Sequence, residues 1–133
     1  MAFVLDASIS AVWALADEAS ALAEIAAHRL KSENALVPPL WWYEVRNLLV
    51  VNERRQRMTV DDTAHYLELL SSFPIQVDPI EDEKAVFRCA RQYRLSFYDA
   101  AYLAVALRNN LQLATLDKAL RDAAQAAGVP LLS

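Results

Sequence analysis

The chain has 133 residues, the length of one domain, and a formal net charge of −4. This charge argues against a protein that binds nucleic acid by general electrostatic attraction. Gly128 is its only glycine, which excludes the glycine-rich phosphate loops of P-loop and dinucleotide-binding proteins.

The single cysteine and the apolar segments indicate where the protein works. Cys89 cannot form an internal disulfide, which fits a reducing cytoplasm, and we expect it to be a small core residue. No apolar run is long enough to span a membrane, although 56% of the residues are hydrophobic. The segment from Met1 to Asp6 has no basic region before an apolar stretch, so a signal peptide is not expected.

Short apolar runs alternate with helical patterns along the whole chain. Strands are predicted over 3–5, 35–37, 74–77 and 111–115, with a weak one over 129–132. Helices are predicted over 9–15, 18–31, 38–57, 59–71, 81–93 and 96–109, and from 116 or 117 to 127. Asp6 or Ser8 can cap the first helix, Thr59 begins the fourth, and Gly128 follows the last.

This alternation predicts an α/β fold with a central parallel sheet of about five short strands, the last at an edge. Helices should flank both faces of the sheet, which gives three layers in a single domain over 1–133. Ligands of such sheets collect beyond the carboxyl ends of the strands.

Two acidic residues follow predicted strands directly. Asp6 comes after Phe3–Leu5, and Asp117 comes after the strand that ends near Thr115. Taken alone, each can be explained as the capping residue or first-turn charge of the following helix, and Thr115 is an alternative cap for the last one.

A third acid, Asp99, opens a helix that is apolar on every side. Ser96-x-x-Asp99 is close to a capping box, but the segment from Ala100 to Leu107 reads as a buried helix. A carboxylate at the start of such a helix needs a partner, so a capping role and a functional role are equally supported.

Glu44 is the hardest of the acids to explain structurally. On a helical wheel it lies between Leu40 and Leu48, on the face that should meet the sheet. Its alternative is an ion pair with a distant arginine, for which the candidates are Arg55, Arg88, Arg91 and Arg94.

Taken together, the four acids indicate a specific kind of site, because a parallel sheet brings the groups at its strand ends to one edge. Two carboxylates about 4 Å apart repel by roughly 4 kcal/mol at an effective dielectric constant of 20. Such a cluster needs protons or cations, and Mg²⁺ and Mn²⁺ prefer oxygen ligands of this kind.

The chain resembles the PIN-domain ribonucleases, and in particular the VapC-type toxins of type II toxin–antitoxin systems. The resemblance rests on residues 4–8, 39–47, 96–104 and 113–117, in that order along the chain. It implies a PIN-like fold in which Asp6 and Asp99 are the principal ligands of Mg²⁺ or Mn²⁺. Glu44 and Asp117 would complete the catalytic pocket through water or a second ion, with Ser8 and Thr115 in support.

The implied activity is that of a metal-dependent endoribonuclease that hydrolyses tRNA or rRNA. The implied partners are a VapB-like antitoxin and a second copy of the chain, in a homodimer or a toxin–antitoxin hetero-oligomer. Trp42, and less clearly Trp13, are candidates for an apolar groove that the antitoxin covers. The basic group 54–57 is a helix-end charge cluster or an RNA contact.

Other classes fit the acids less well. A response-regulator receiver needs adjacent acids after its first strand, and a haloacid-dehalogenase phosphatase needs Asp-x-Asp, whereas this chain has Asp6-Ala7-Ser8. His28 and His65 stand apart from the acids, which disfavours a histidine-pair ribonuclease and a zinc site. A PIN-fold binding or regulatory module without catalysis remains an alternative.

Overall fold

The structure is a computed structural model that describes residues 2–15 and 17–133. Its strands are β1 (Ala2–Leu5), β2 (Asn34–Val37), β3 (Ile75–Val77) and β4 (Gln112–Ala114). Its helices are α1 (Ala7–Ala14), α2 (Ala21–Arg29), α3 (Leu40–Arg54), α4 (Val60–Ser71), α5 (Glu83–Tyr93), α6 (Phe97–Asn109) and α7 (Lys118–Ala126).

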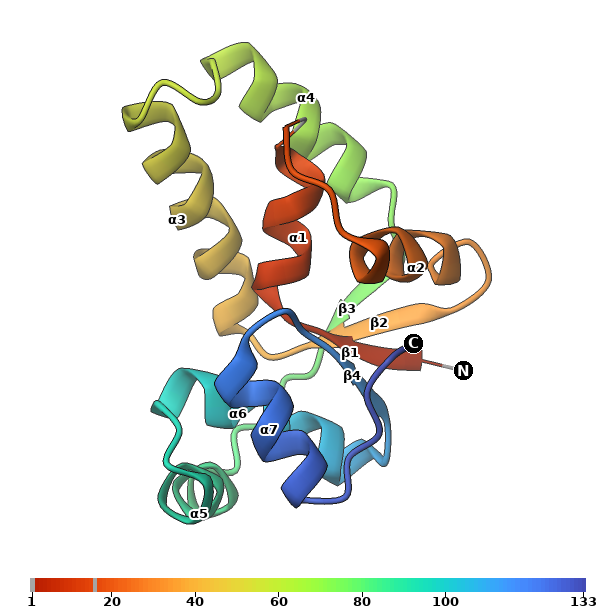
Figure 1. Cartoon of the computed structure of the whole chain (residues 1–133), viewed down its shortest axis with the longest axis vertical. Coiled ribbons are helices and arrows are strands. Elements are labelled where there is room, and N and C mark those ends of the chain that lie inside the picture. The colour runs from red at the N-terminus through yellow and green to blue at the C-terminus, as the bar shows by residue number, and fades with distance from the viewer. Residues whose placement is uncertain (1, 16) are drawn as a thin grey trace.

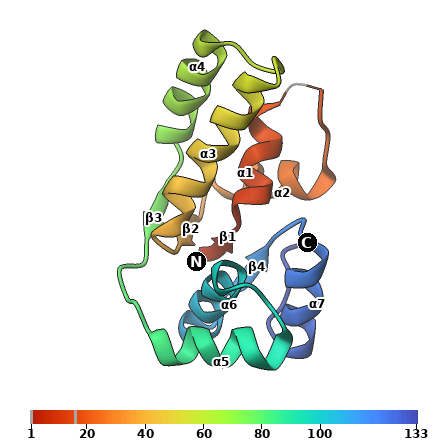
Figure 2. The same ribbon diagram turned by 90° about the vertical axis from the view of Figure 1, so that its left-hand side faces the viewer.

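The strands form one parallel sheet in the order β3-β2-β1-β4. Phe3 of β1 pairs with Ala35 on one side and with Gln112 on the other, so β1 has neighbours on both edges. Helices α1 to α4 lie on one side of the sheet and α5 to α7 on the other (Figures 1 and 2). The α/β fold with three layers is therefore confirmed.

The core is built around β1 and α6. Phe3, Val4 and Leu5 are fully buried, as expected of a parallel strand covered on both faces. Helix α6 is buried from Tyr102 to Ala106, which confirms the prediction of an internal helix, although Leu107 is exposed. Cys89 is buried in the same core, as predicted. Within the described residues, no helix is long and apolar enough to cross a membrane.

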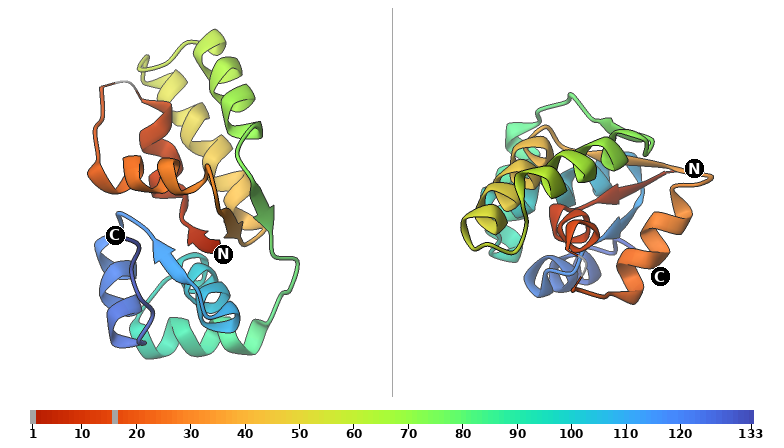
Figure 3. Two further views of the ribbon diagram at one scale, coloured as in Figure 1. Left: turned by 90° about the vertical axis from the view of Figure 1, so that its right-hand side faces the viewer. Right: turned by 90° about the horizontal axis from the view of Figure 1, so that it is seen from above.

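The predicted fifth strand is reduced to one bridge, between Leu113 and Leu131. The carbonyl of Pro130 accepts from the Leu113 N–H at 2.9 Å, and the Leu132 N–H donates back to the Leu113 carbonyl at 3.0 Å. Because Pro130 has no N–H, the pairing stops there. The predicted place at an edge of the sheet is confirmed, and the edge is that of β4. The predicted length was wrong, and Figure 3 draws the segment that leads to the C-terminus without a strand arrow.

Capping side chains set the helix boundaries that differ from the prediction. Helix α2 begins after Ser20, whose hydroxyl accepts from the Ala23 N–H, rather than near Glu18. Asp82 likewise delays the start of α5. Ser8 lies inside α1 and does not cap it, while the capping box at Thr59 and the left-handed Gly128 after α7 are as predicted.

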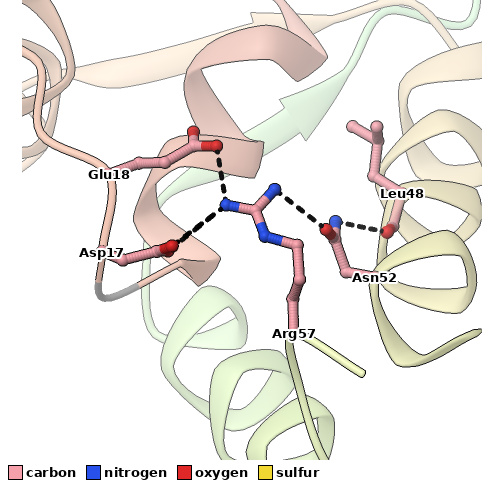
Figure 4. Close-up of polar contacts among 5 residues, drawn as sticks. All are labelled: Asp17, Glu18, Leu48, Asn52 and Arg57. Carbon is pink, nitrogen blue, oxygen red and sulfur yellow. Dashed lines mark hydrogen bonds and ion pairs between the residues drawn. The ribbon is translucent and has the colours of Figure 1, made fainter. Parts of the chain in front are cut away.

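Helix α3 ends at Arg54, before the predicted limit, because the chain turns at Gln56, which has a positive φ. The turn brings Arg57 back to the connector between α1 and α2, where it donates to Asp17 at 3.3 Å and to Glu18 at 3.2 Å (Figure 4). It also donates to the buried Asn52 at 3.5 Å. Arg57 is thus paired with two carboxylates, unlike Arg54 and Arg55 of the same basic group, which form no ion pair in the described structure.

Arg94 ends α5 in the left-handed region, with φ of 54°, where a residue with a side chain is strained. We predict that Arg94→Gly raises the free energy of unfolding by up to about 1 kcal/mol, measured by urea denaturation. Arg88→Gly, in the interior of the same helix, should lower it by about 1 kcal/mol. Equal losses in both variants would contradict the assignment of strain to Arg94.

Candidate active site

Asp6 is fixed by the strand that precedes it. Its backbone N–H donates to the Ala114 carbonyl at 3.0 Å, which extends the pairing of β1 with β4 by one residue. Its side chain makes no capping bond to α1, so the capping explanation does not hold. The carboxylate is instead 6% exposed at the carboxyl ends of the two strands.

Two hydroxyl groups hold the Asp6 carboxylate. Ser8 donates to Oδ2 at 2.8 Å and Thr115 donates to it at 2.6 Å. Each hydroxyl in turn accepts a backbone N–H, from Leu116 at 3.0 Å and from Asp117 at 3.1 Å. Because each hydroxyl oxygen accepts a backbone N–H, its own proton is available to donate to the Asp6 carboxylate. Burial raises the pKa of Asp6 despite these bonds, and the charge of Asp117 adds to the shift.

Glu44 is half-buried on α3 and accepts a hydrogen bond from the Tyr102 hydroxyl at 2.5 Å. Burial raises its pKa, the bond from Tyr102 opposes this, and the charges of Asp6 and Asp99 raise it further. None of the arginines considered as partners forms an ion pair with Glu44; among the described residues, Tyr102 is its hydrogen-bond partner.

Asp99 lies in the first turn of α6. Its N–H donates to the Ser96 hydroxyl at 3.0 Å, but its carboxylate does not return the bond to Ser96, so only half of the capping box forms. Burial is the largest cause of its raised pKa, followed by the charges of Asp117 and Asp6. Its carboxylate is therefore free for another role.

Asp117 is the N-cap of α7, where it accepts from the Leu120 N–H at 3.0 Å. This confirms its capping role and excludes Thr115 as the cap. Its charge also reaches Asp6 and Asp99, whose pKa values it raises. Asp117 thus belongs to the same electrostatic cluster while it holds the helix.

The structure therefore brings all four predicted acids into one region of mutual repulsion, from β1, α3, α6 and α7. No cation lowers the pKa of Asp6, Glu44 or Asp99. Within residues 2–15 and 17–133, however, no three His, Cys, Asp or Glu side chains lie close enough together to hold one ion.

The donor chemistry fits Mg²⁺ or Mn²⁺. All four groups are carboxylates, the hard oxygen ligands that these ions prefer. The candidate nitrogen and sulfur ligands lie elsewhere, since His28 and His65 are exposed and Cys89 is buried beside α6. PIN-domain nucleases generally use a divalent metal.

Tyr102 is the site residue that the sequence interpretation missed. It is fully buried and lies three positions after Asp99 on α6, so the two side chains lie on the same side of the helix. Burial and the bond to Glu44 raise its pKa strongly, which keeps the hydroxyl a donor. The sequence could have indicated Tyr102 as a site residue, because its large polar ring stands among apolar and mostly small residues in Ala100-Ala101-Tyr102-Leu103-Ala104.

The tryptophans do not share one surface. Trp13 packs against Phe73, with ring centroids 5.2 Å apart, and its indole N–H donates to the Ala23 carbonyl. Trp42 is 49% exposed and carries the Arg46 guanidinium over its ring at 4.2 Å. Of the two, Trp42 is the exposed one, and Trp13 is half-buried.

The raised pKa of Asp99 leads to a prediction for stability without metal. Folding favours its protonated form, so the protein loses stability as the pH rises from about 3.9 through the raised value. In EDTA at neutral pH, we expect Asp99→Asn to be more stable than the parent, and the gap to close in acid. Urea denaturation measures this, with the exposed Asp61→Asn as the control. A variant less stable than the parent at every pH would refute the repulsion.

Comparisons with known proteins identify relatives of this chain. The sequence profile of the PIN domain matches residues 3–126. The exonuclease VapC9 of Pyrobaculum aerophilum is 38% identical over 108 residues, 77% of this chain and 80% of that protein. The ribonuclease VapC3 of the same organism is 33% identical over 125 residues, 92% of this chain and 94% of that protein.

Solved structures share the fold. The crystal structure of PAE2754 from Pyrobaculum aerophilum has a TM-score of 0.69 and 31% identity, covering 92% of this chain and 79% of that one. Mycobacterium tuberculosis VapC20 has a TM-score of 0.63 and covers 98% of both chains, and at 16% identity it speaks for the fold alone. The chain therefore belongs to the PIN-domain family and is of the VapC type.

Proposed function

We propose that this chain is a metal-dependent endoribonuclease, the toxin of a toxin–antitoxin pair, that hydrolyses phosphodiester bonds of tRNA or rRNA. One observation carries the proposal: four carboxylates without a cationic partner gather at the carboxyl edge of the sheet. The names of the relatives, a ribonuclease and an exonuclease, support nuclease chemistry. An enzyme with this substrate works in the cytoplasm.

Each acid has a role in the proposal. Asp6 and Asp99 would hold the ion, while Glu44 and Asp117 would orient water or hold a second ion. When bound, Mg²⁺ or Mn²⁺ supplies charge that polarises the scissile phosphate and lowers the pKa of water. Ser8 and Thr115 keep Asp6 in position.

The buried Tyr102 occupies one oxygen of Glu44, at 2.5 Å, and so sets the direction of the other. An outer partner of this kind orients a ligand and is typically worth about 10–100-fold in metal affinity or activity.

The non-catalytic PIN module has one observation in its favour, the absence of three close ligands within the described part of the chain. Metal binding separates the two functions. Calorimetric titration with Mn²⁺ gives heat that Asp99→Asn abolishes if the acids form a working site, and no heat if the chain is a binding module.

We predict RNA cleavage that needs Mg²⁺ or Mn²⁺, stops in EDTA and returns on addition of the ion. Asp99→Asn should lose more than the roughly 10–100-fold that outer partners are worth, because it removes a direct ligand. Gel analysis of total RNA measures the loss, and Asp61→Asn should retain the parental rate. Full cleavage in EDTA would reject the metal-dependent function, and cleavage of a circular RNA distinguishes an endonuclease from an exonuclease.

The proposed antitoxin contact lies at the start of α3. Trp42 and Tyr43 are both exposed, with ring centroids 5.0 Å apart in an edge-on arrangement. A VapB-like segment that covers these rings would bind on the face of α3 that the Arg46 guanidinium also occupies.

A homodimer is proposed through α5, whose charges are segregated along its length. Glu81, Asp82 and Glu83 stand at its beginning, while Arg88, Arg91 and Arg94 lie toward its end. Two copies related by a twofold axis can pair these ends antiparallel. Phe87 is exposed between them and contacts Phe97 at 4.9 Å between ring centroids, which supplies an apolar centre.

We expect Phe87→Asp to convert a dimer into a monomer, because it places a charge in the apolar centre of the contact. Light scattering after size-exclusion chromatography measures the mass. Val60→Asp, at an exposed apolar position on α4, is the control and should leave the mass unchanged. A Phe87→Asp protein that stays dimeric would place the interface elsewhere.

A further inference from the structure

RNA brings negative charge to a site that is itself acidic, so the chain must supply a cation near the acids. Of its 13 Lys and Arg residues, four already form ion pairs with carboxylates: Arg29, Arg57, Arg108 and Lys118. Another seven are exposed and have no ion pair in the described structure: Lys31, Arg54, Arg55, Lys84, Arg88, Arg91 and Arg94. Only Arg46 and Arg121 are partly buried without a carboxylate partner among the described residues.

Partial burial of a guanidinium without a carboxylate is unfavourable unless something else compensates it. Each of the two donates to a backbone carbonyl, Arg46 to Trp42 at 3.3 Å and Arg121 to Thr115 at 3.0 Å. Both side chains are therefore oriented by hydrogen bonds to the backbone, whereas none of the seven exposed lysines and arginines has a side-chain hydrogen bond in the described structure. An oriented cation that lacks a counter-charge is the form expected of an anion-binding residue.

Arg46 already has a partner for its charge. Its guanidinium lies 4.2 Å from the centre of the Trp42 ring, which compensates a cation. It also follows Glu44 by two residues in α3, which turns it about 200° away from that acid around the helix. Arg46 therefore faces away from the cluster.

Arg121 is placed beside the cluster. The carbonyl that it contacts belongs to Thr115, whose hydroxyl donates to Asp6 at 2.6 Å. Its guanidinium thus lies at the end of β4, on the backbone of the residue that holds Asp6, and forms no ion pair with any of the acids in the described structure. The cation adjoins the site without neutralising it.

We propose that Arg121 binds a backbone phosphate of the RNA, next to the phosphate that is cleaved. One nitrogen of the guanidinium is held by Thr115, and the remaining donors form a fork that matches phosphate oxygens. The inference rests on the nuclease function proposed above and adds to it the residue that positions the substrate backbone.

The experiment measures RNA binding separately from cleavage. Arg121→Gln is made in the Asp99→Asn background, which holds RNA without cutting it, and Gln can still donate to the Thr115 carbonyl. Binding of a fluorescein-labelled, homopolymeric single-stranded RNA is followed by anisotropy across a salt series. We expect roughly tenfold weaker binding, and a salt dependence whose slope shrinks by about 0.7, the value for one lost phosphate contact.

Lys118→Gln is the matched control, since it removes the same charge from the same helix but from a residue paired with Asp122. It should bind nearly as the parent does. Arg121→Lys keeps the charge but lacks the paired guanidinium donors. The slope of the salt dependence should therefore return to the parental value, while the affinity for RNA recovers only in part. Melting curves check the fold, and Arg121→Lys carries the test if Arg121→Gln unfolds.

Two results would overturn the inference: Arg121→Gln that binds RNA as the parent does, or an equal loss in Lys118→Gln. Neither depends on catalysis. In the cleaving protein, Arg121→Gln should raise KM with little change in kcat, as expected for a contact made in both ground and transition states. A chain that binds RNA through Arg121 but never cleaves it would refute the nuclease function and leave this contact standing.

Discussion

Repulsion between carboxylates that cannot move apart is the constraint behind this structure. Asp6 is locked in the sheet by its bond to Ala114, and Asp117 is locked at the start of α7 by its bond from Leu120. Their positions follow from backbone geometry, so the charges stay close whatever the surroundings. Hydroxyl groups at Ser8 and Thr115 favour the ionised form of Asp6, and burial opposes it.

Helix geometry moderates this repulsion in part. Asp99 lies in the first turn of α6 and Asp117 caps α7, so both stand at the positive end of a helix. Such positions stabilise an acid by about 0.3–1 kcal/mol. For Asp99 this does not offset burial and the repulsion of Asp117 and Asp6, because its pKa is still raised.

Much of this was available from the sequence. The alternation of short apolar runs and helical patterns was enough for the order of elements, because each pattern is local. The four acids could be grouped because strand ends in a parallel sheet share one edge. The bond between Tyr102 and Glu44 could not be predicted, since 58 residues separate them and no local rule joins them. The same holds for Arg57, whose partners are set by a turn at Gln56 rather than by the helix before it.

Asp117 both caps α7 and adds a charge to the acidic cluster, and this has a consequence for how such a protein can change by mutation. Asparagine caps a helix as well as aspartate does, so Asp117→Asn would erase one charge and keep α7 in place. This corner of the fold can lose a charge of the acidic cluster without a penalty in folding. Asp6 cannot be replaced in this way by a residue of another shape. Such a replacement would leave the hydroxyl groups of Ser8 and Thr115 without their acceptor.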